Sequence, residues 1–444
     1  MSETIVAIAT ANGVGSIAIV RLSGDDALNV AKKLTKDIDL PPRYAKLSKI
    51  YSTSGEFLDE AILIYFKAPH SFSGEDIVEF QCHGGYIVAS LVLKACIDAG
   101  ARLAEAGEFS KRAFLNGKID LSRAEAIAAL IEARSSDAQR VLARQLTGEL
   151  SDFVDALRDE LVLLLAHSEV VIDYAEEDLP SDLVLSIETK LAQSATKLDS
   201  IVRSSLAREG LMQGFKVAIV GKPNVGKSSL LNQLLNRQRA IVSSVAGTTR
   251  DTLEEQLRIG SHLVRIVDTA GIRDASDEIE TIGIERSLES IKECDIVVAL
   301  FDSSRIYDAE DEKVLEHIDE FAKQKSVIYV KNKTDLPPCF DGMLDFDLEL
   351  NSKKDASALV KKLESIMDLS NDSEEIMLIS QRQIESVQNC SSHLQDAILP
   401  IRDGELEIFS YHLLEAIKAL TSITKGYDNE EMLDKMFGSF CLGK

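Results

Sequence analysis

Hydrophobic and polar positions divide the chain of 444 residues into regions with different periodicities. Before Leu121, apolar residues alternate with polar ones in strand-like runs, which mix with helix-like runs and glycine-containing turns. The strand-like runs are Ile5–Ala9, Ser16–Leu22 and Ala61–Phe66, and the helix-like runs are Asp26–Leu34 and Tyr86–Ala99. This mixture predicts an α+β domain of about 118 residues.

Two later segments show a helical period. From Leu121 to Arg208 and again from Ser380 to Phe437, apolar residues recur every three or four positions, and the first segment contains almost no glycine. Neither segment alone closes a core. We therefore expect one discontinuous helical bundle, into which the region between the two segments is inserted. Two separate helical appendages are the alternative.

The inserted region, roughly Phe215 to Leu363, begins with a phosphate-binding motif. The apolar run Phe215–Val220 leads into Gly221-Lys222-Pro223-Asn224-Val225-Gly226-Lys227-Ser228, and the helix-like stretch Ser229–Leu235 follows. A strand, a glycine loop and a helix start in this order direct backbone N–H groups and the positive end of the helix dipole at a phosphate chain. Lys227 would add a charge on the outer phosphates, and Ser228 would offer its hydroxyl to Mg²⁺.

A second motif indicates which base is bound. The apolar run Ser326–Val330 ends in Lys331-Asn332-Lys333-Thr334-Asp335, which contains the N-K-x-D pattern. The Asp335 carboxylate can accept from N1–H and from the exocyclic amine of guanine, whereas adenine offers it no matching donors. The sequence therefore predicts GTP as the nucleotide.

Two further motifs lie between these two. Asp268-Thr269-Ala270-Gly271 follows the strand-like run Leu263–Val267 and offers a carboxylate for the Mg²⁺ shell and a glycine N–H for the γ-phosphate. Gly247-Thr248-Thr249-Arg250-Asp251 offers Thr249 to Mg²⁺. After the last predicted strand, Asn351-Ser352-Lys353 corresponds only imperfectly to the usual base-contacting S-A-K.

The hydrolytic residues depart from the Ras-type pattern. Ile272 stands where a glutamine would orient the attacking water, and a hydrophobic side chain cannot hold that water. The stretch Arg273–Arg286 is rich in carboxylates that could take over this role. Taken alone, such an acidic run is usually a solvated loop and helix.

Composition limits the classes of function. Asp plus Glu number 73 against 49 Lys plus Arg, and the net charge of −24 argues against a general nucleic-acid binder. The six cysteines form no C-x-x-C pair, so we expect neither a disulfide framework nor a cysteine zinc site. We also expect a cytoplasmic protein without a membrane segment, because no apolar run reaches about 18 residues and no basic leader is present.

Motifs in all three regions resemble one family. They are Thr4–Ala7, Ile19–Gly24, Ser71–Asp76, Glu79–Gly85, Gly107–Lys118 and Phe440–Lys444. Together they are similar to the MnmE (TrmE) family of tRNA wobble-uridine modification GTPases. The resemblance implies a GTP hydrolase that forms a homodimer and acts with the FAD-containing flavoprotein MnmG (GidA), in a heterotetramer. The two proteins would add a carboxymethylaminomethyl or aminomethyl group to C5 of the wobble uridine of certain tRNAs, using 5,10-methylene-tetrahydrofolate and glycine or ammonium.

The resemblance also implies roles for individual residues. Folate, or 5-formyl-tetrahydrofolate as a bound analogue, would contact Arg21, Glu79, Lys118 and Lys444. Glu280 would position the attacking water, and Cys441 is a candidate participant in the modification. Asn224 would bind K⁺ together with the loop Ser243–Thr248, through Ser243, Val245 and Thr248, while Ser228 and Thr249 would bind Mg²⁺. The full GTP-binding set is Asn224, Val225, Gly226, Lys227, Ser228, Ser229, Ser243, Ser244, Val245, Ala246, Gly247, Thr248, Thr249, Asp268, Thr269, Ala270, Gly271, Asn332, Lys333 and Asp335.

The resemblance and the periodicity together predict a multidomain chain of α+β, all-α and α/β parts. Residues 1–118 would form a tetrahydrofolate-binding dimerisation domain, 119–212 and 367–444 the two parts of the helical domain, and 213–366 an inserted Ras-like P-loop G domain. A regulatory GTPase of ribosome assembly is the alternative function, but it would be expected to carry a basic RNA-binding appendage. A stand-alone one-carbon transferase would leave the GTPase unused.

Overall fold

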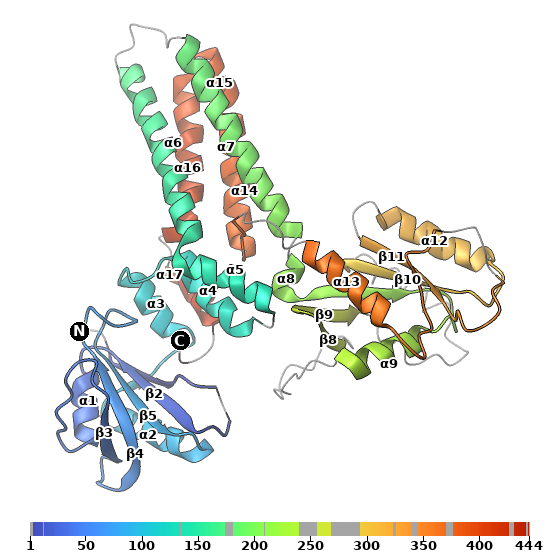
Figure 1. The fold of residues 1–444 in the computed structure, drawn as a ribbon. Helices are drawn as coiled ribbons and strands as arrows, with labels where there is room; N and C mark the ends of the chain where they lie inside the picture. The colour runs from blue at the N-terminus through green and yellow to red at the C-terminus, as the bar shows by residue number, and fades with distance from the viewer. Residues whose placement is uncertain are drawn as a thin grey trace. The chain divides into compact units, whose positions relative to one another are not determined.

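The structure is a computed structural model. It describes residues 3–11, 13–133, 135–173, 181–207, 209–238, 255–267, 294–322, 326–339, 345–369, 376–425, 430–440 and 443. The chain divides into two compact units, one formed by Met1–Ile131, Arg144–Thr196 and Glu385–Lys444, and the other by Glu132–Ala143 and Lys197–Ile384. Figure 1 gives the element labels used below.

The N-terminal region folds around a six-stranded sheet with the order β3-β4-β5-β2-β1-β6. Its strands are β1 (Ile5–Ile8), β2 (Ile17–Ser23), β3 (Lys46–Tyr51), β4 (Phe57–Phe66), β5 (Ile77–His83) and β6 (Arg102–Leu103). Every pair is antiparallel except β1 with β6, which is parallel. The predicted strands and helices of this region are confirmed, and the predicted strand from Ala61 begins earlier, at Phe57.

Helices cover one face of this sheet. They are α1 (Ala27–Leu34) and α2 (Tyr86–Asp98), and a third helix, α3 (Glu108–Leu115), follows β6. Val30 and Leu34 of α1 and Val92 of α2 are buried against Val20 and Phe80 of the sheet, so this face holds the core of the domain. On the opposite face, Phe109 of α3 is buried with Ile5, Ala7 and Ala104. The alternation of β2 therefore directs Arg21, the partner of Ala7 across the strands, to the face that carries α3.

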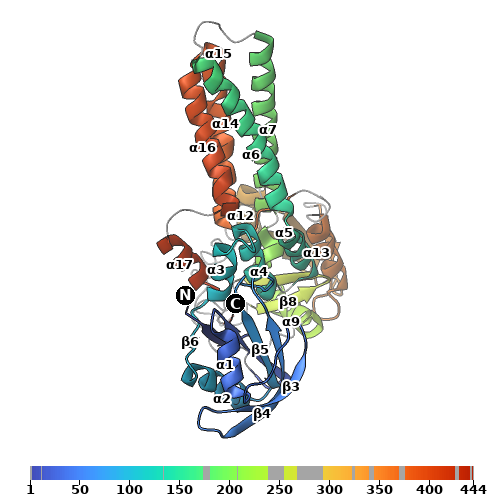
Figure 2. The same cartoon turned by 90° about the vertical axis from the view of Figure 1, so that its left-hand side faces the viewer.

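The two segments with helical periodicity are helical. The first forms α4 (Leu121–Glu132), α5 (Ser136–Thr147), α6 (Glu149–Asp173) and α7 (Ser181–Ala207), and a short helix, α8 (Glu209–Gln213), follows it. The second forms α14 (Gln381–Asp396), α15 (Ile398–Asp403), α16 (Leu406–Lys425) and α17 (Glu430–Gly438). Both views show α6 and α16 side by side (Figures 1 and 2).

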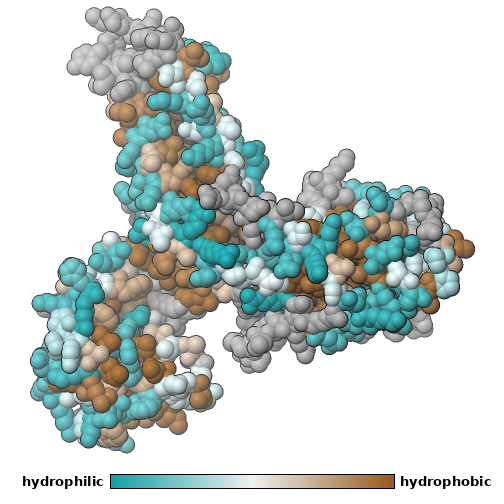
Figure 3. All heavy atoms as spheres, in the orientation of Figure 1, coloured by the Kyte–Doolittle hydropathy of each residue, from teal (hydrophilic) through white to brown (hydrophobic). Residues whose placement is uncertain are grey.

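Hydrogen bonds join the helices of the two segments. The hydroxyls of Ser168 on α6 and Ser410 on α16 lie 2.9 Å apart, and Ser391 on α14 donates to the carbonyl of Ala195 on α7 at 3.3 Å. At the surface of the bundle, Arg402 pairs with Glu188 at 2.8 Å. The bundle is therefore discontinuous in sequence, as predicted, and the insertion lies between its two segments along the chain. Hydrophilic and hydrophobic side chains are interspersed over its surface on the face drawn in Figure 3.

The insertion folds around a second six-stranded sheet with the order β12-β11-β10-β7-β9-β8. Its strands are β7 (Phe215–Val220), β8 (Glu255–Ile259), β9 (His262–Val267), β10 (Ile296–Asp302), β11 (Ser326–Asn332) and β12 (Leu348–Glu349). All neighbours are parallel except β8 and β9. Parallel strands that are covered on both faces read as continuous apolar runs, and β10 is buried along its whole length.

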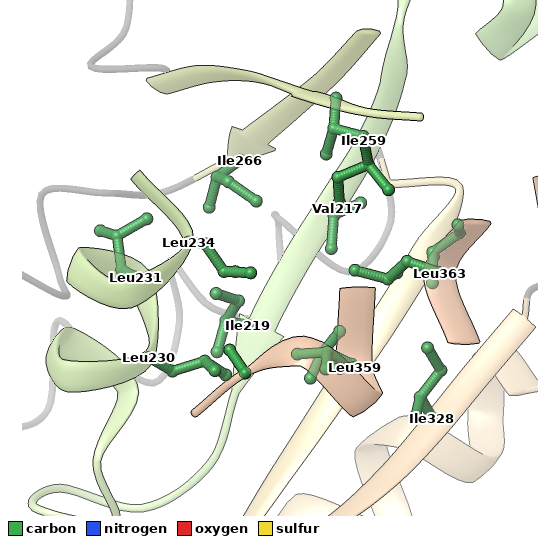
Figure 4. Close-up of a cluster of buried hydrophobic side chains, with 14 of the residues drawn as sticks. Val217, Ile219, Leu230, Leu231, Leu234, Ile259, Ile266, Ile328, Leu359 and Leu363 are labelled. Atoms are coloured by element: carbon green, nitrogen blue, oxygen red, sulfur yellow. The ribbon is translucent and has the colours of Figure 1, made fainter. Parts of the chain in front are cut away.

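Helices cover both faces of this sheet. They are α9 (Lys227–Gln238), α12 (Ala309–Ala322) and α13 (Ser357–Leu369). On one face, Leu230 and Leu234 of α9 and Leu359 and Leu363 of α13 pack on Val217 and its neighbours (Figure 4). On the other face, Ile318 of α12 is buried with alternate residues of β7 and β10. This is a P-loop α/β fold of the predicted class, and its ligand site is expected at the carboxyl ends of the parallel strands.

Candidate functional site

The phosphate loop joins the carboxyl end of β7 to the start of α9. Two of its glycines are required by close approach: a Cβ on Gly221 would lie 2.4 Å from the carbonyl oxygen of Leu300, and one on Gly226 would lie 2.3 Å from the side-chain nitrogen of Asn332. Both have positive φ angles, of 147° and 109°. Val225 is buried between them, which ties the loop to the core, while Asn224 is exposed with φ 64°.

Lys227 is held by the loop itself. Its Nζ donates to the carbonyl oxygens of Gly221 at 2.6 Å and Lys222 at 2.9 Å. The ammonium group therefore lies against the backbone of the phosphate loop, and its contact with the outer phosphates stays a prediction. Ser228 and Ser229 follow it in the first turn of α9, where helix N–H groups lack intrahelical partners.

A second lysine anchors the outer side of the loop. Lys222 Nζ lies 2.7 Å from carboxylate oxygens of both Asp308 and Asp311. Burial by itself would lower the pKa of Lys222, but the hydrogen bonds to the two aspartates outweigh it and the pKa is raised. The cation is therefore permanently charged, and it fixes the loop to the segment that begins α12.

The N-K-x-D motif is bonded directly to the phosphate loop. Asn332 is fully buried at the end of β11, and its side-chain nitrogen donates to the carbonyl of Val225 at 2.7 Å and to the hydroxyl of Ser352 at 2.9 Å. The backbone N–H of Ser352 donates in return to the Asn332 oxygen at 2.9 Å. One amide therefore connects three loops at the same edge of the sheet.

The loop Asn351–Lys353 thus lies next to the N-K-x-D motif, although its sequence fits the family pattern imperfectly. Ser352 is buried, and the Lys353 carbonyl accepts from Gln233 of α9 at 2.8 Å. Whether this loop contacts guanine stays a prediction.

Lys333 and Asp335 complete the motif on the exposed side. Lys333 has φ 60° and forms an ion pair of 2.6 Å with Asp302, the last residue of β10. Burial alone would raise the pKa of Asp302, but hydrogen bonds from Lys333 and Ser304 outweigh it and lower the pKa, so the carboxylate stays ionised. Asp335 is exposed at the loop, where its carboxylate can meet a base.

The switch motifs lie outside the described residues. This applies to Ser243, Ser244, Val245, Ala246, Gly247, Thr248 and Thr249, to Asp268, Thr269, Ala270 and Gly271, and to Glu280. The described part of the chain leads to them at one point: β9 ends at Val267, next to β7, so its carboxyl end lies beside the phosphate loop.

A second cluster lies on the face of the N-terminal sheet that carries α3. Arg21 of β2 and Glu79 of β5 face each other across the strands and form an ion pair of 2.8 Å. The guanidinium also lies 5.9 Å from the ring centre of Phe72 and 5.8 Å from that of Phe109, which is within the range of cation–π contact. The two predicted residues are therefore together, beside the exposed ring of Phe72 and the buried ring of Phe109.

A network of charges continues from this cluster to α3. Arg112 contacts Glu75 at 3.0 Å and Glu108 at 2.9 Å, and Glu108 also accepts from Arg102 at 2.7 Å. Glu75 in turn accepts from Ser23, whose hydroxyl lies 2.7 Å from that of Ser73. The segments around residues 75 and 108 are thus fixed to β2 by hydrogen-bonded charges.

The remaining N-terminal residues are placed only in part. Lys118 is exposed, and its aliphatic chain passes over Gly74, where an added Cβ would lie 3.2 Å from Lys118 Cγ. Gly443, near the C-terminus, packs on β1, since a Cβ there would lie 2.3 Å from the carbonyl oxygen of Ile8. The chain end thus returns to the N-terminal sheet. Cys441 and Lys444 lie outside the described residues.

Sequence reasoning missed several partners in these clusters. Asp302, Phe72, Phe109 and Arg112 were not singled out, although the last three lie in the motif blocks Ser71–Asp76 and Gly107–Lys118. For Asp302 the available signal was a carboxylate at the end of an apolar strand, followed by serine.

The five described cysteines are free thiols, and none of the described helices is long and apolar enough to cross a membrane.

Comparison with known proteins covers almost the whole chain. Residues 4–118 match the family model described as the GTP-binding protein TrmE N-terminus, and residues 121–441 match the MnmE helical domain. The chain is 63% identical to the tRNA modification GTPase MnmE of Sulfurimonas denitrificans over 446 residues, which is 100% of both chains. It is 56% identical to the protein of the same name from Aliarcobacter butzleri, over 100% of this chain and 99% of that one.

Among solved structures, Era of Aquifex aeolicus bound to GDP and aluminium fluoride is 25% identical. The match spans 40% of this chain and 66% of the Era chain, with a TM-score of 0.26. A TM-score this low says nothing about how the present site works. The two family models match the N-terminal region and the helical segments on both sides of the insertion, and the relatives match the full length of the chain. The chain belongs to the MnmE (TrmE) family of tRNA modification GTPases.

Proposed function

We propose that this GTPase depends on K⁺ and modifies the wobble uridine of certain tRNAs together with the flavoprotein MnmG (GidA), which carries FAD. GTP turnover would accompany the addition of a carboxymethylaminomethyl or aminomethyl group to C5, with 5,10-methylene-tetrahydrofolate as the one-carbon donor. Membership of the family supports GTP as the nucleotide and tRNA as the substrate. We add K⁺, the one-carbon donor and the flavoprotein partner, and we expect the reaction to take place in the cytoplasm.

The observation that carries the ion dependence is the position of Asn224. It is exposed in the phosphate loop with φ 64°, two residues before Gly226. An asparagine tolerates this left-handed conformation better than most residues do, and its side chain offers a neutral oxygen. K⁺ beside the β- and γ-phosphates would neutralise charge that develops during hydrolysis, where other GTPases use an arginine. Backbone oxygens of Ser243, Val245 and Thr248 would complete the shell.

The other groups of the nucleotide site have proposed roles as well. Mg²⁺ would be held by Ser228 and Thr249, and Glu280 would orient the water that Ile272 cannot hold. The guanine would be recognised by Asn332, Lys333 and Asp335.

In the N-terminal domain, residues 1–118, we propose that Arg21, Glu79, Lys118 and Lys444 bind the folate. Support comes from the 2.8 Å pair of Arg21 and Glu79, from the aromatic rings beside it, and from Gly443 against Ile8. The exposed ring of Phe72 suits contact with a flat pterin ring, and a guanidinium with a carboxylate can bond its polar edge.

The assembly would be a homodimer that joins MnmG in a heterotetramer. We propose that the N-terminal domains hold the dimer constitutively, whereas the G domains (213–366) meet only when K⁺ and the loop Ser243–Asp251 form a contact surface around the transition state. The helical domain (119–212 and 367–444) would connect the two. A contact that is made only in one state is favoured by the extra affinity of that state for K⁺, and about 1.4 kcal/mol shifts the balance tenfold.

The decisive experiment measures GTP turnover by the full chain in KCl and in NaCl at equal ionic strength. We expect turnover in KCl and little in NaCl, because a site of mostly neutral oxygens must match the size of the ion. Equal rates in the two salts would overturn the ion dependence.

A second experiment tests the modification itself. A strain that lacks the gene is complemented with the wild type or with Arg21→Gln, and the wobble uridine of its tRNA is analysed. Full modification by Arg21→Gln would contradict the folate site.

A further inference from the structure

We propose that the helical bundle carries a binding site for Zn²⁺ or a similar divalent transition-metal ion, formed by His393, Asp396 and His412. His393 and Asp396 lie on α14 and His412 lies on α16, the two helices that α15 connects (Figure 1). One ligand atom of each residue lies within 4.8 Å of the others. The site belongs to the bundle, and nothing in the nucleotide or folate chemistry above uses it.

The distance between the imidazoles suits a shared ion. The two Nδ1 atoms lie 3.3 Å apart, and the ring centres are 5.6 Å apart with an interplanar angle of 44°. In a tetrahedral zinc site, bonds of about 2.0–2.1 Å place two nitrogen ligands about 3.3–3.4 Å from each other. The two Nδ1 atoms are thus already as far apart as two nitrogen ligands of such a site. Without an ion, one Nδ1 must carry a hydrogen for the other to accept it.

The backbone holds these side chains in place. His393 precedes Leu394 on α14, and His412 precedes Leu413 on α16, and both leucines are fully buried. Neighbours that are locked in the core fix the Cα positions of the two histidines, whose own side chains are half-buried. Asp396 follows His393 by three residues, so it lies on the same face of α14, and it is exposed. An exposed carboxylate can rotate toward an ion at little cost.

A further carboxylate lies near the cluster. Glu415, three residues after His412, accepts a hydrogen bond from Lys418 at 2.7 Å. This hydrogen bond is the largest cause acting on Glu415, and together with the charge of Lys418 it lowers the pKa of the carboxyl against the opposing effect of burial. Its negative charge would favour a cation in this part of the bundle.

The chemistry of the donors selects the class of ion. Two imidazoles and one carboxylate suit Zn²⁺, Ni²⁺ or Cu²⁺, whereas Mg²⁺ and Ca²⁺ prefer sets made only of oxygen. Three protein ligands leave the fourth tetrahedral position to water. An ion here would link α14 to α16 and stabilise the bundle, without competing with the Mg²⁺ and K⁺ of the nucleotide site.

The test uses the full chain, stripped of metal and nucleotide, in equilibrium dialysis against Zn²⁺. We expect one ion per chain, and a rise in melting temperature with Zn²⁺ that follows from linkage. His393→Gln and His412→Gln should each weaken binding by about 100-fold or more, because losing a ligand costs more than losing an outer partner, and Asp396→Asn should weaken it by a smaller factor. His70→Gln, at an exposed position of the N-terminal region, should bind as the wild type does.

Two further measurements keep the test decisive. Melting curves without zinc should coincide for the wild type and the variants, which excludes misfolding, and the exposed Asp396→Asn variant offers the mildest change. Co²⁺ should give the intense visible absorption of a tetrahedral site with nitrogen ligands in the wild type, and lose it in His412→Gln. Zinc bound equally well by His412→Gln, or less than one ion per chain in the wild type, would overturn the proposal.

Discussion

The side-chain amide of Asn332 donates a hydrogen bond of 2.7 Å to the backbone carbonyl of Val225, so the guanine motif and the phosphate loop are directly bonded. The two residues are 107 positions apart in sequence, and both are buried. The bond fixes the distance between the end of the site that binds phosphate and the end that binds the base. Nucleotide affinity should therefore depend on Asn332 even apart from any contact it makes with guanine.

We expect Asn332→Ala to weaken GDP binding by about 10- to 100-fold, or about 1.4–2.8 kcal/mol. The change leaves the Val225 carbonyl and the Ser352 N–H buried without this partner, and each such group costs about 1–3 kcal/mol. Ser352→Ala is the graded control, because it removes one bond and keeps the one to Val225. Titration with a fluorescent guanine nucleotide measures both. Wild-type affinity in Asn332→Ala would show that the bond does not organise the site.

Asp335→Asn should change the base preference from guanine to xanthine. An amide at this position can donate to the C2 carbonyl of xanthine, whereas it presents a donor to the exocyclic amine of guanine. We expect the affinity for GDP to fall by about 100-fold or more and the affinity for the xanthine nucleotide to rise.

The matched control is Asp345→Asn, which makes the same chemical change at an exposed position of the same region. Competition between the two nucleotides measures the preference. If Asp335→Asn still prefers GDP, the base is not recognised by this carboxylate.

The fold could be predicted where local pattern and final environment agree. The run before the phosphate loop coincides with β7 because that strand is buried on both faces. Strand β4 begins at Phe57, four residues before the predicted start. The pattern did not reveal this start, because the polar residue Asp59 occupies a buried position that faces the core. His83 satisfies this carboxylate with bonds of 2.9 Å from its N–H and 2.7 Å from Nδ1. A buried polar residue interrupts the alternation, and its partner is distant in sequence.

The candidate sites divide in the same way. Lys227, Asn332 and Asp335 belong to short motifs whose chemistry depends on neighbours in sequence, so they could be identified from the letters alone. The contact of Arg21 with Phe72 and Phe109 depends on how β2, the loop after β4 and α3 come together. The pair His393 and His412 shows no motif either, because it arises from the packing of α14 on α16.

Glu280→Ala should lower kcat for GTP hydrolysis by roughly 100-fold or more and leave nucleotide affinity nearly unchanged. The physical reason is that a residue that orients the water acts on the chemical step and not on the bound ligand. Glu278→Ala, in the same acidic run, is the control and should keep most of the activity. Single-turnover kinetics and GTP titration separate the two effects. A matching loss of GTP binding would assign Glu280 a structural role.

The last prediction concerns Glu108 and the pH dependence of stability. Burial by itself would raise the pKa of Glu108, but hydrogen bonds from Arg102, from the Glu105 N–H and from Arg112 outweigh it, and the pKa lies below the ordinary value of 4.5. A carboxylate whose pKa is lowered by folding stabilises the folded state above its unfolded pKa, and this contribution is lost as the pH falls.

Glu108→Gln should therefore reduce the stability of the N-terminal domain at pH 7 by about 1–3 kcal/mol, because two arginines lose a charged partner. The difference from the wild type should shrink as the pH decreases below about 4.5, where the unfolded chain binds the proton. Glu105→Gln removes the same charge from an exposed side chain and keeps the backbone N–H, so it should leave the melting temperature nearly unchanged. Calorimetric melting of the three proteins from pH 7 down to about pH 2 provides the measurement. A difference that stays constant or grows as the pH falls would mean that Glu108 stabilises the fold through packing and not through its charge.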